Sequence, residues 1–228
     1  LMKMMSRANF FKVFLGIESP NTNSLRECGK LQNVRRDLAE TVRIIQQNGM
    51  QVMGGFIVGF DSDTESIFET QIRFIQQVGV VSAMVGLLIA LPQTQLWQRL
   101  KAEGRLLSDA TGDIDGRINF IPKMEKGILM EGYRKILSTI YSHKFYYQRI
   151  DTFIKQYKPT VRGRISKKDI IAFARSIWRI GILSKARFLY WKLLVKTMFT
   201  KIKALPMAVE LAIFGVHYER FSQKISAN

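Results

Sequence analysis

Cysteine is nearly absent from the sequence, because Cys28 carries the only thiol among 228 residues. A single cysteine excludes an internal disulfide framework and is typical of a reducing compartment, so we expect a cytoplasmic protein. We interpret Cys28 as a small buried residue rather than a ligand. Histidine is also scarce: His143 and His217 each stand alone, without the spacing of a metal-binding pair. The sequence therefore predicts no metal site within this chain.

Long apolar runs and several familiar catalytic motifs are missing as well. No segment reaches the roughly 18 uninterrupted apolar residues of a membrane-spanning helix. A nucleotide P-loop, an HExxH metal motif and a GxSxG nucleophile motif do not occur. These motifs therefore identify no catalytic residue.

Acidic residues are scarce in the last third of the chain. Residues 151–228 contain 16 Lys and Arg but 4 Asp and Glu, so they contribute +12 of the overall net charge of +17. A surface this basic attracts nucleic acid, anionic lipid or an acidic partner, and charge alone does not choose among them.

The first half of the sequence contains a repeated strand–helix unit. Runs of β-branched and aromatic residues predict strands at 11–17, 51–60 and 80–88, and helical periodicity predicts helices at 34–48, 64–78 and 96–103. Gly49, Gly79 and Gly104 follow these helices as stops, and Asp63 offers an N-cap oxygen to the second helix. Strands that alternate with helices predict an α/β fold with a parallel sheet, open or closed into a barrel.

The strand at 51–60 is rich in glycine. Gly54, Gly55 and Gly59 have no Cβ, so another backbone or a flat ligand can lie directly against this strand. Parallel α/β folds bind their ligands at the carboxyl ends of the strands, where this strand meets the next helix. Close packing of a helix on the sheet explains the same glycines equally well, and both interpretations stay open.

Residues 105–125 break the strand–helix rhythm with a polar loop. Its turn-forming residues are Asp109, Gly112, Asp113, Asp115, Gly116 and Asn119. Beyond the loop the sequence predicts helices alone, near 127–142, 144–157, 166–180, 183–204 and 207–222. We therefore expect two domains, an α/β domain at 1–125 and a basic helical domain at 126–228.

Several stretches, in this order and spacing, resemble a known family. Residues 14–20 (FLGIESP), 55–61 (GFIVGFD) and 91–96 (LPQTQL) resemble the second half of a radical S-adenosylmethionine enzyme, more narrowly of the cobalamin-binding branch. The stretches at 112–113, 119–124, 146–149 and 215–218 resemble the C-terminal extension of that branch. The resemblance implies the C-terminal half of a partial (β/α) barrel at 1–125, followed by a helical extension at 126–228.

The resemblance also implies cofactor-binding roles. In such enzymes a carboxylate after the fourth barrel strand contacts the ribose of S-adenosylmethionine, and here that residue is Glu18, with Ser19 beside it as a donor. Lys30 is expected to reach the methionyl carboxylate, while the fifth-strand backbone and two leucines enclose the adenine. The implied cofactor-binding residues are Glu18, Ser19, Lys30, Gly55, Ile57, Gly59, Leu87 and Leu88. Without the resemblance, Glu18 and Lys30 are better explained as solvated surface charges.

The sequence departs from this family at the iron–sulfur cluster. The three-cysteine loop CxxxCxxC and the cobalamin-binding domain are absent, and the Pro-Gly-Thr turn usual after the sixth strand is Pro92-Gln93-Thr94 here. A four-iron four-sulfur cluster needs several thiolates, which one cysteine does not provide. We therefore expect half of an active site. The chain would bind S-adenosylmethionine, the full-length protein would hold the cluster and cobalamin elsewhere, and this chain alone would be inactive.

The helix predicted at 183–204 carries an apolar stripe bordered by lysines. The stripe consists of Phe188, Trp191, Val195, Met198 and Ile202, and its border of Lys185, Lys192, Lys196 and Lys203. The first interpretation is a helix that faces the core, and the second is contact with a membrane surface. Nucleic-acid binding is the least favoured, because the aromatic residues do not alternate with the lysines.

Two functions follow from these observations. The first is a fragment of a cobalamin-dependent radical S-adenosylmethionine enzyme, a C-methyltransferase that acts on an unactivated carbon of a small, lipid-like substrate at the inner face of the membrane. The alternative is a non-catalytic protein, built on a partial barrel, that binds a nucleotide or a membrane surface.

Overall fold

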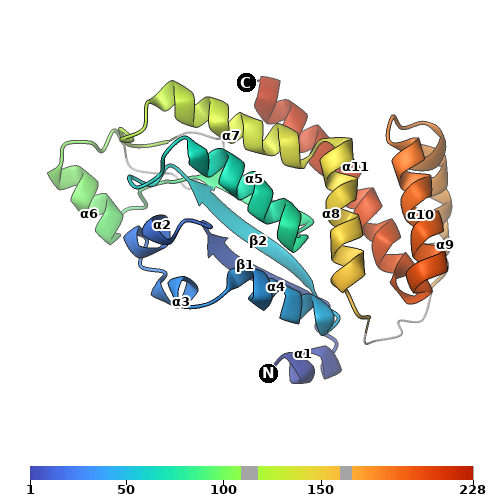
Figure 1. Cartoon of the computed structure of the whole chain (residues 1–228). Helices are drawn as coiled ribbons and strands as arrows, with labels where there is room; N and C mark the ends of the chain where they lie inside the picture. The colour runs from blue at the N-terminus through green and yellow to red at the C-terminus, as the bar shows by residue number, and fades with distance from the viewer. Residues whose placement is uncertain (109–117, 160–165, 228) are drawn as a thin grey trace.

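The computed structural model describes residues 1–108, 118–159 and 166–227, and its fold is α/β (Figure 1). Three strands, β1 (Lys12–Glu18), β2 (Gln51–Val58) and β3 (Ser82–Leu87), form one sheet in the order β1-β2-β3. Both pairings are parallel, with Leu15 opposite Gly54 and Gly54 opposite Ala83. The expected α/β class and parallel sheet are confirmed.

Within the described residues 1–108 there are six helices. They are α1 (Met2–Arg7), α2 (Thr22–Glu27), α3 (Leu31–Val34), α4 (Leu38–Gln47), α5 (Ser66–Val78) and α6 (Gln95–Ala102). The predicted stops are confirmed, because Gly49, Gly79 and Gly104 have φ values of 80°, 68° and 68°. These left-handed conformations end the helices, and after Gly49 and Gly79 the chain returns to the sheet.

Two predicted helix starts are wrong, and both errors concern an aspartate. Helix α4 begins at Leu38 rather than near residue 34, because the side chain of Asp37 accepts a hydrogen bond from the Glu40 amide (3.0 Å). Helix α5 begins at Ser66 without a side-chain cap, so Asp63 is not its N-cap. Asp63 instead binds the loop that follows β2.

The predicted C-terminal helices are all present, with shifted ends. They are α7 (Lys126–Ile140), α8 (His143–Gln156), α9 (Lys167–Ser176), α10 (Arg187–Lys201) and α11 (Leu205–Ala227). A π-helical segment, η1 (Ile177–Ile182), continues α9, and a 3₁₀ turn, η2 (Ile202–Ala204), separates α10 from α11. Pro206 lies in the first turn of α11, where its missing N–H costs no helical hydrogen bond. Residues 109–117 of the predicted loop at 105–125 lie outside the described residues.

The core lies on one face of the sheet. Helices α4 and α7 contact the strands, α5 packs against α7, and α8 packs against α5. Along β2, Val52, Phe56 and Val58 are buried on this side. One cluster of buried side chains includes both strand residues and residues of α7, α8, α10 and α11. The predicted boundary between two domains at 125/126 therefore stays a prediction. The segments on its two sides contribute side chains to the same core.

A fully buried arginine joins the sheet to the C-terminal helices. Arg149 of α8 donates to Gln76 Oε1 (2.7 Å), to the Ile140 carbonyl and to the Val81 carbonyl (3.4 Å). Two hydroxyls of the same region also bind β3: Tyr141 donates to Ala83 O (2.6 Å) and Tyr133 to Val85 O (3.3 Å). Burial lowers the pKa of Arg149 to about 10, so its guanidinium stays charged at neutral pH.

Candidate functional site

The face of the sheet opposite the core is open over much of its surface. Phe14 of β1 and Met84 of β3 point to this side and are 61% and 46% exposed. Each strand also contributes a glycine, because Gly16, Gly55 and Gly86 share this face, and Gly16 pairs directly with Gly55. A Cβ added at Gly86 would meet no atom within 4 Å. We call this glycine-lined surface the floor; it is open to a planar group at Gly86, whereas the Phe14 ring lies over Gly55.

An ion pair borders this floor at the carboxyl end of β1. Lys30 Nζ lies 3.0 Å from Glu18 Oε1, and the two side chains are 36% and 17% exposed. The backbone at Glu18 has a φ of 63° and follows a register shift after Gly16. A Cβ at Gly16 would lie 2.7 Å from Glu18 Oε1 and 3.2 Å from Lys30 Nζ. Gly16 thus makes room for both charged groups to lie over the floor.

Asn33 holds this corner of the sheet in place. Its Nδ2 donates to the Gly16 carbonyl (3.0 Å) and more weakly to the Ile17 carbonyl (3.4 Å). A carboxylate at this rim accepts hydrogen bonds from hydroxyl groups, and an ammonium binds a carboxylate. The pair can therefore recognise a ligand that carries both a diol and an acid.

The loop after β2 is organised by buried Asp63. Its carboxylate accepts hydrogen bonds from Ser24 Oγ (2.6 Å), Gly59 N (2.9 Å) and Phe60 N (3.1 Å). Burial raises the pKa of Asp63, and these three donors oppose that increase. The loop at the carboxyl end of the central strand therefore has a fixed shape.

A second network of charges supports the same loop. Arg105 binds Asp61 through two hydrogen bonds of 2.7 and 2.9 Å, and Arg99 Nη1 lies 3.2 Å from the same carboxylate. Glu27 of α2 accepts from the amides of Asp61 and Ser62, both at 3.0 Å. Glu27, Arg99 and Arg105 were not among the residues predicted from the sequence. The run of polar residues directly after a buried strand was a usable signal, although it did not reveal the partners.

The structure separates the predicted cofactor-binding residues into two groups. Glu18, Lys30, Gly55 and Ile57 lie together on or beside the open face. The other four are Ser19, Gly59, Leu87 and Leu88. Ser19 is fully buried, and its Oγ accepts from Asn21 N (3.1 Å), while Leu87 and Leu88 belong to two buried clusters. The predicted roles of all eight residues remain predictions.

The glycines of β2 serve different purposes. A Cβ at Gly54 would lie 2.9 Å from Val80 Cγ1, and one at Gly59 would lie 3.2 Å from Leu129 Cδ2 of α7, so these two glycines allow close packing. Gly55 faces the open side, where the ring of Phe14 comes within 2.9 Å of its Cβ position. Close packing of a helix is therefore confirmed at Gly59, and the binding of a flat ligand at Gly55 stays a prediction.

Two further sequence expectations can be compared with the structure. Cys28 is exposed, so its interpretation as a buried residue is wrong; it follows the short helix α2 on the surface. Gln93 has a φ of 67°, which is the left-handed conformation that glycine adopts without strain. The turn after β3 therefore keeps a glycine-like backbone although glutamine replaces glycine.

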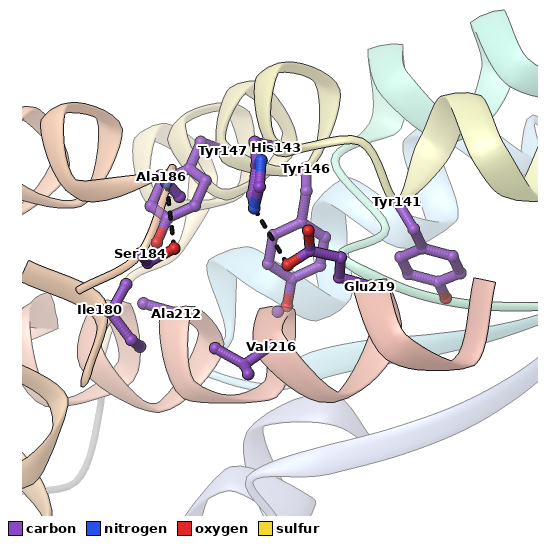
Figure 2. A pocket seen from close by; sticks show the side chains of 11 residues that line it. Tyr141, His143, Tyr146, Tyr147, Ile180, Ser184, Ala186, Ala212, Val216 and Glu219 are labelled. Atoms are coloured by element: carbon purple, nitrogen blue, oxygen red, sulfur yellow. Dashed lines mark hydrogen bonds and ion pairs between the residues drawn. The ribbon is translucent and has the colours of Figure 1, made fainter. Parts of the chain in front are cut away.

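A groove lies on the other side of the molecule, where the α7–α8 turn meets α11. Figure 2 shows the neighbouring pocket, which shares Tyr141, His143 and Glu219 with this groove; His143 points toward Glu219, and its Nε2 lies 3.0 Å from Glu219 Oε2. The groove has a volume of about 400 Å³ and is lined by Ser138, Tyr141, Ser142, His143, Glu219, Ser222 and Gln223. Its lining shares no residue with the open face of the sheet.

We expect Asp61→Asn to lower the free energy of unfolding by about 1–3 kcal/mol near neutral pH, because it removes a paired charge from two short hydrogen bonds. Hydrogen bonding from Arg105 holds the pKa of Asp61 below its ordinary value of 3.8. The stability that this ion pair contributes is therefore complete above that value and is lost as the pH falls through the lower, folded-state pKa.

Urea unfolding followed by tryptophan fluorescence, from about pH 7 to about pH 3, measures both effects. The control is Glu69→Gln, which breaks an exposed pair with Lys135 (2.7 Å) and should cost at most about 1 kcal/mol. Equal losses in the two variants would contradict the structural role of Asp61.

Comparison with known proteins gives a family match and several relatives. Residues 94–228 match the family described as a domain of unknown function, DUF4070. An uncharacterized methyltransferase of Synechocystis sp. is 34% identical over 197 residues, which are 84% of this chain and 37% of the relative. The hopanoid C-2 methylase of Rhodopseudomonas palustris is 28% identical over 238 residues, covering 100% of this chain and 44% of the relative.

A third relative, the bacteriochlorophyllide d C-12(1)-methyltransferase of Chlorobaculum tepidum, is 29% identical over 87 residues, or 38% of this chain and 19% of its own length. The chain thus spans less than half the length of these relatives, all of which are named as methylases or methyltransferases. The chain belongs to the DUF4070 family and, with it, to the cobalamin-binding radical S-adenosylmethionine proteins.

Proposed function

We propose that the chain is the C-terminal half of a cobalamin-dependent radical S-adenosylmethionine C-methyltransferase, and that the open face of its sheet binds S-adenosylmethionine. The observation that carries this proposal is the glycine floor beside the Glu18–Lys30 pair. In this proposal the three strands are the second half of a partial (β/α) barrel. The methyltransferase names of the relatives support the reaction class.

The residues present suit S-adenosylmethionine. Glu18 would accept hydrogen bonds from the two ribose hydroxyls, and Lys30 would bind the methionyl carboxylate once it leaves Glu18. The space above Gly86 would admit the adenine, and the Phe14 ring, which lies over Gly55, would flank it or move aside. When bound, the cofactors supply hydrogen abstraction from an unactivated carbon and the methyl group that replaces the hydrogen.

The residues present do not suit the iron–sulfur cluster. The sequence offers one thiol, Cys28, which is exposed next to α2. A four-iron cluster needs several thiolates, so a different segment of the full-length enzyme would hold it. The presence of a single thiol in this chain also favours a second candidate function, in which the chain binds a nucleotide without catalysis.

Glu18→Gln in the full-length protein should weaken binding of S-adenosylmethionine about 10- to 100-fold, because an amide replaces the charged acceptor of two hydrogen bonds. A second variant, Gly86→Val, should weaken binding by placing a side chain in the space above the floor. Titration calorimetry measures both affinities.

The control for this experiment is Glu131→Gln, an exposed glutamate on α7 that should leave the affinity unchanged. Normal affinity in both test variants would remove the open face from the cofactor site. Cofactor binding without any cluster in the full-length protein would instead favour the non-catalytic function.

A further inference from the structure

Helices α9 and α10 lie at one end of the molecule, on the side of α8 that faces away from the sheet (Figure 1), where both contact η1 and α11. We call residues 167–202, which comprise α9, η1, α10 and the start of η2, the α9–α10 arm. Helix α9 contributes little to the core, because Ser176 is the one buried residue among its ten. This arm therefore presents most of its surface to the surroundings.

The exposed side of α9 is amphipathic. Ile170, Ile171 and Trp178 recur at i, i+1 and i+8, so they lie on one face of the helix, and they are 60%, 52% and 61% exposed. Lys168 and Arg175, three residues before and four residues after Ile171, border this apolar face. A helix normally buries such an apolar face against its own protein, and this one does not.

Helix α10 has two apolar faces. Tyr190, Leu193 and Leu194 are buried against the rest of the protein. The predicted stripe lies on the opposite side: Phe188, Trp191, Val195, Met198 and Ile202 are 75%, 42%, 47%, 45% and 61% exposed, and Phe199 beside them is 80% exposed. The interpretation of this stripe as a core-facing surface is therefore wrong, because a different set of α10 residues reaches the core.

The charge of this region is almost entirely positive. Residues 166–204 contain 10 Lys and Arg and one acidic residue, Asp169, whose carboxylate binds Ser166 in a capping box. Lys196 pairs with Asp151 (2.5 Å), and Lys201 donates to the last carbonyls of α8, so these two serve the fold. Lys185, Lys192 and Lys203 are exposed along one border of the stripe.

We propose that the α9–α10 arm docks the protein on an anionic phospholipid bilayer. Large apolar side chains such as Trp178, Phe188 and Phe199 would enter the interface between headgroups and acyl chains, and the bordering lysines would bind lipid phosphates. Within the described residues, no helix is long and apolar enough to cross a bilayer, so the arm would lie on the surface. This inference is independent of the proposed function.

The positive charge of this surface favours an anionic bilayer over other binding partners. A second copy of the chain would bring like charges of two arms together, which opposes association. A nucleic acid would match the charge, but its bases stack on aromatic residues interleaved with lysines, whereas here the aromatics lie among aliphatic side chains. An anionic bilayer complements both the apolar stripe and its basic border.

Sedimentation with vesicles tests the proposal on the whole chain. The protein should sediment with phosphatidylcholine–phosphatidylserine vesicles at about 0.1 M salt, bind far less to pure phosphatidylcholine, and lose most binding at about 0.5 M salt. The charge variant Lys185→Glu/Lys192→Glu/Lys203→Glu should weaken the partition about 100-fold or more. The apolar variant Phe188→Ser/Phe199→Ser should weaken it similarly.

The matched control reverses three exposed basic residues outside the arm, Lys3→Glu/Arg36→Glu/Lys126→Glu, and should keep most of the binding. Circular dichroism should show all variants folded, since every changed side chain is exposed. A wild-type chain that ignores anionic vesicles overturns the proposal. An equal loss of vesicle binding in the control and in the charge variant also overturns it. The same holds if the wild-type chain binds no vesicles but forms a dimer that the apolar variant does not form.

Discussion

Arg149→Met should lower the free energy of unfolding by about 3–5 kcal/mol, the largest effect that we expect from a single substitution in this protein. The guanidinium is fully buried and supplies hydrogen bonds to Gln76 and to the carbonyls of Ile140 and Val81. Methionine fills most of the volume but leaves these acceptors without their donor. Urea unfolding followed by tryptophan fluorescence gives the value directly.

Two further variants show whether the hydrogen bonds cause this loss. Arg149→Lys keeps the charge but not the fork of donors, so it should lose nearly as much stability as Arg149→Met. Arg73→Met removes an exposed arginine of α5 and should change stability by no more than about 0.5 kcal/mol. If Arg149→Met costs less than about 1 kcal/mol, the buried cation does not hold the sheet to the helices.

Gly132→Val should be the second most destabilising change, at about 3 kcal/mol, because it overpacks the contact between α5 and α7. A Cβ at Gly132 would lie 2.2 Å from two atoms of the Phe68 ring, which is itself buried. The ring cannot move away without opening the core. Thermal unfolding monitored by circular dichroism measures the loss.

Gly86→Val is the matched control, since that position is open and a strand favours a β-branched residue. It should leave the stability of the chain unchanged or slightly higher. A double variant, Gly132→Val/Phe68→Ala, should lose less stability than the sum of its two single changes, because the small residue removes the clash. If the losses of stability in the two single variants simply add in the double variant, the contact between residue 132 and Phe68 is not the cause of the loss.

Most of the fold could be predicted from local patterns. The alternation of β-branched strands and periodic helices gave the class and the parallel sheet, and glycines marked the helix ends because left-handed backbone favours them. The start of α4 was wrong because the cap at Asp37 was overlooked, and the start of α5 because Asp63 is a plausible cap in sequence but not in the fold. Only the fold decides that Asp37 caps a helix while Asp63 turns back to the Gly59 amide.

The candidate site was less predictable than the fold. Glu18 and Lys30 were found through a resemblance, and their ion pair depends on Gly16, which no local pattern singles out. Gly54 and Gly55 are neighbours with opposite orientations, so alternation along the strand separates packing from an open floor. The network of Asp61 with Arg105 joins residues far apart in the chain, and long-range pairs of this kind are invisible to spacing rules.

The hydroxyls of Tyr133 and Tyr141 determine where the sheet can grow. The amide of Leu88 faces β2, where it donates to Val58 O (2.9 Å), so the carbonyls of Val81, Ala83 and Val85 face the outer edge of β3. All three accept hydrogen bonds from side chains of α7, α8 or the turn between them. An additional strand, in a longer protein or in an aggregate, would have to displace these donors to pair with β3. Growth of the sheet is therefore directed to β1, and β3 forms its end.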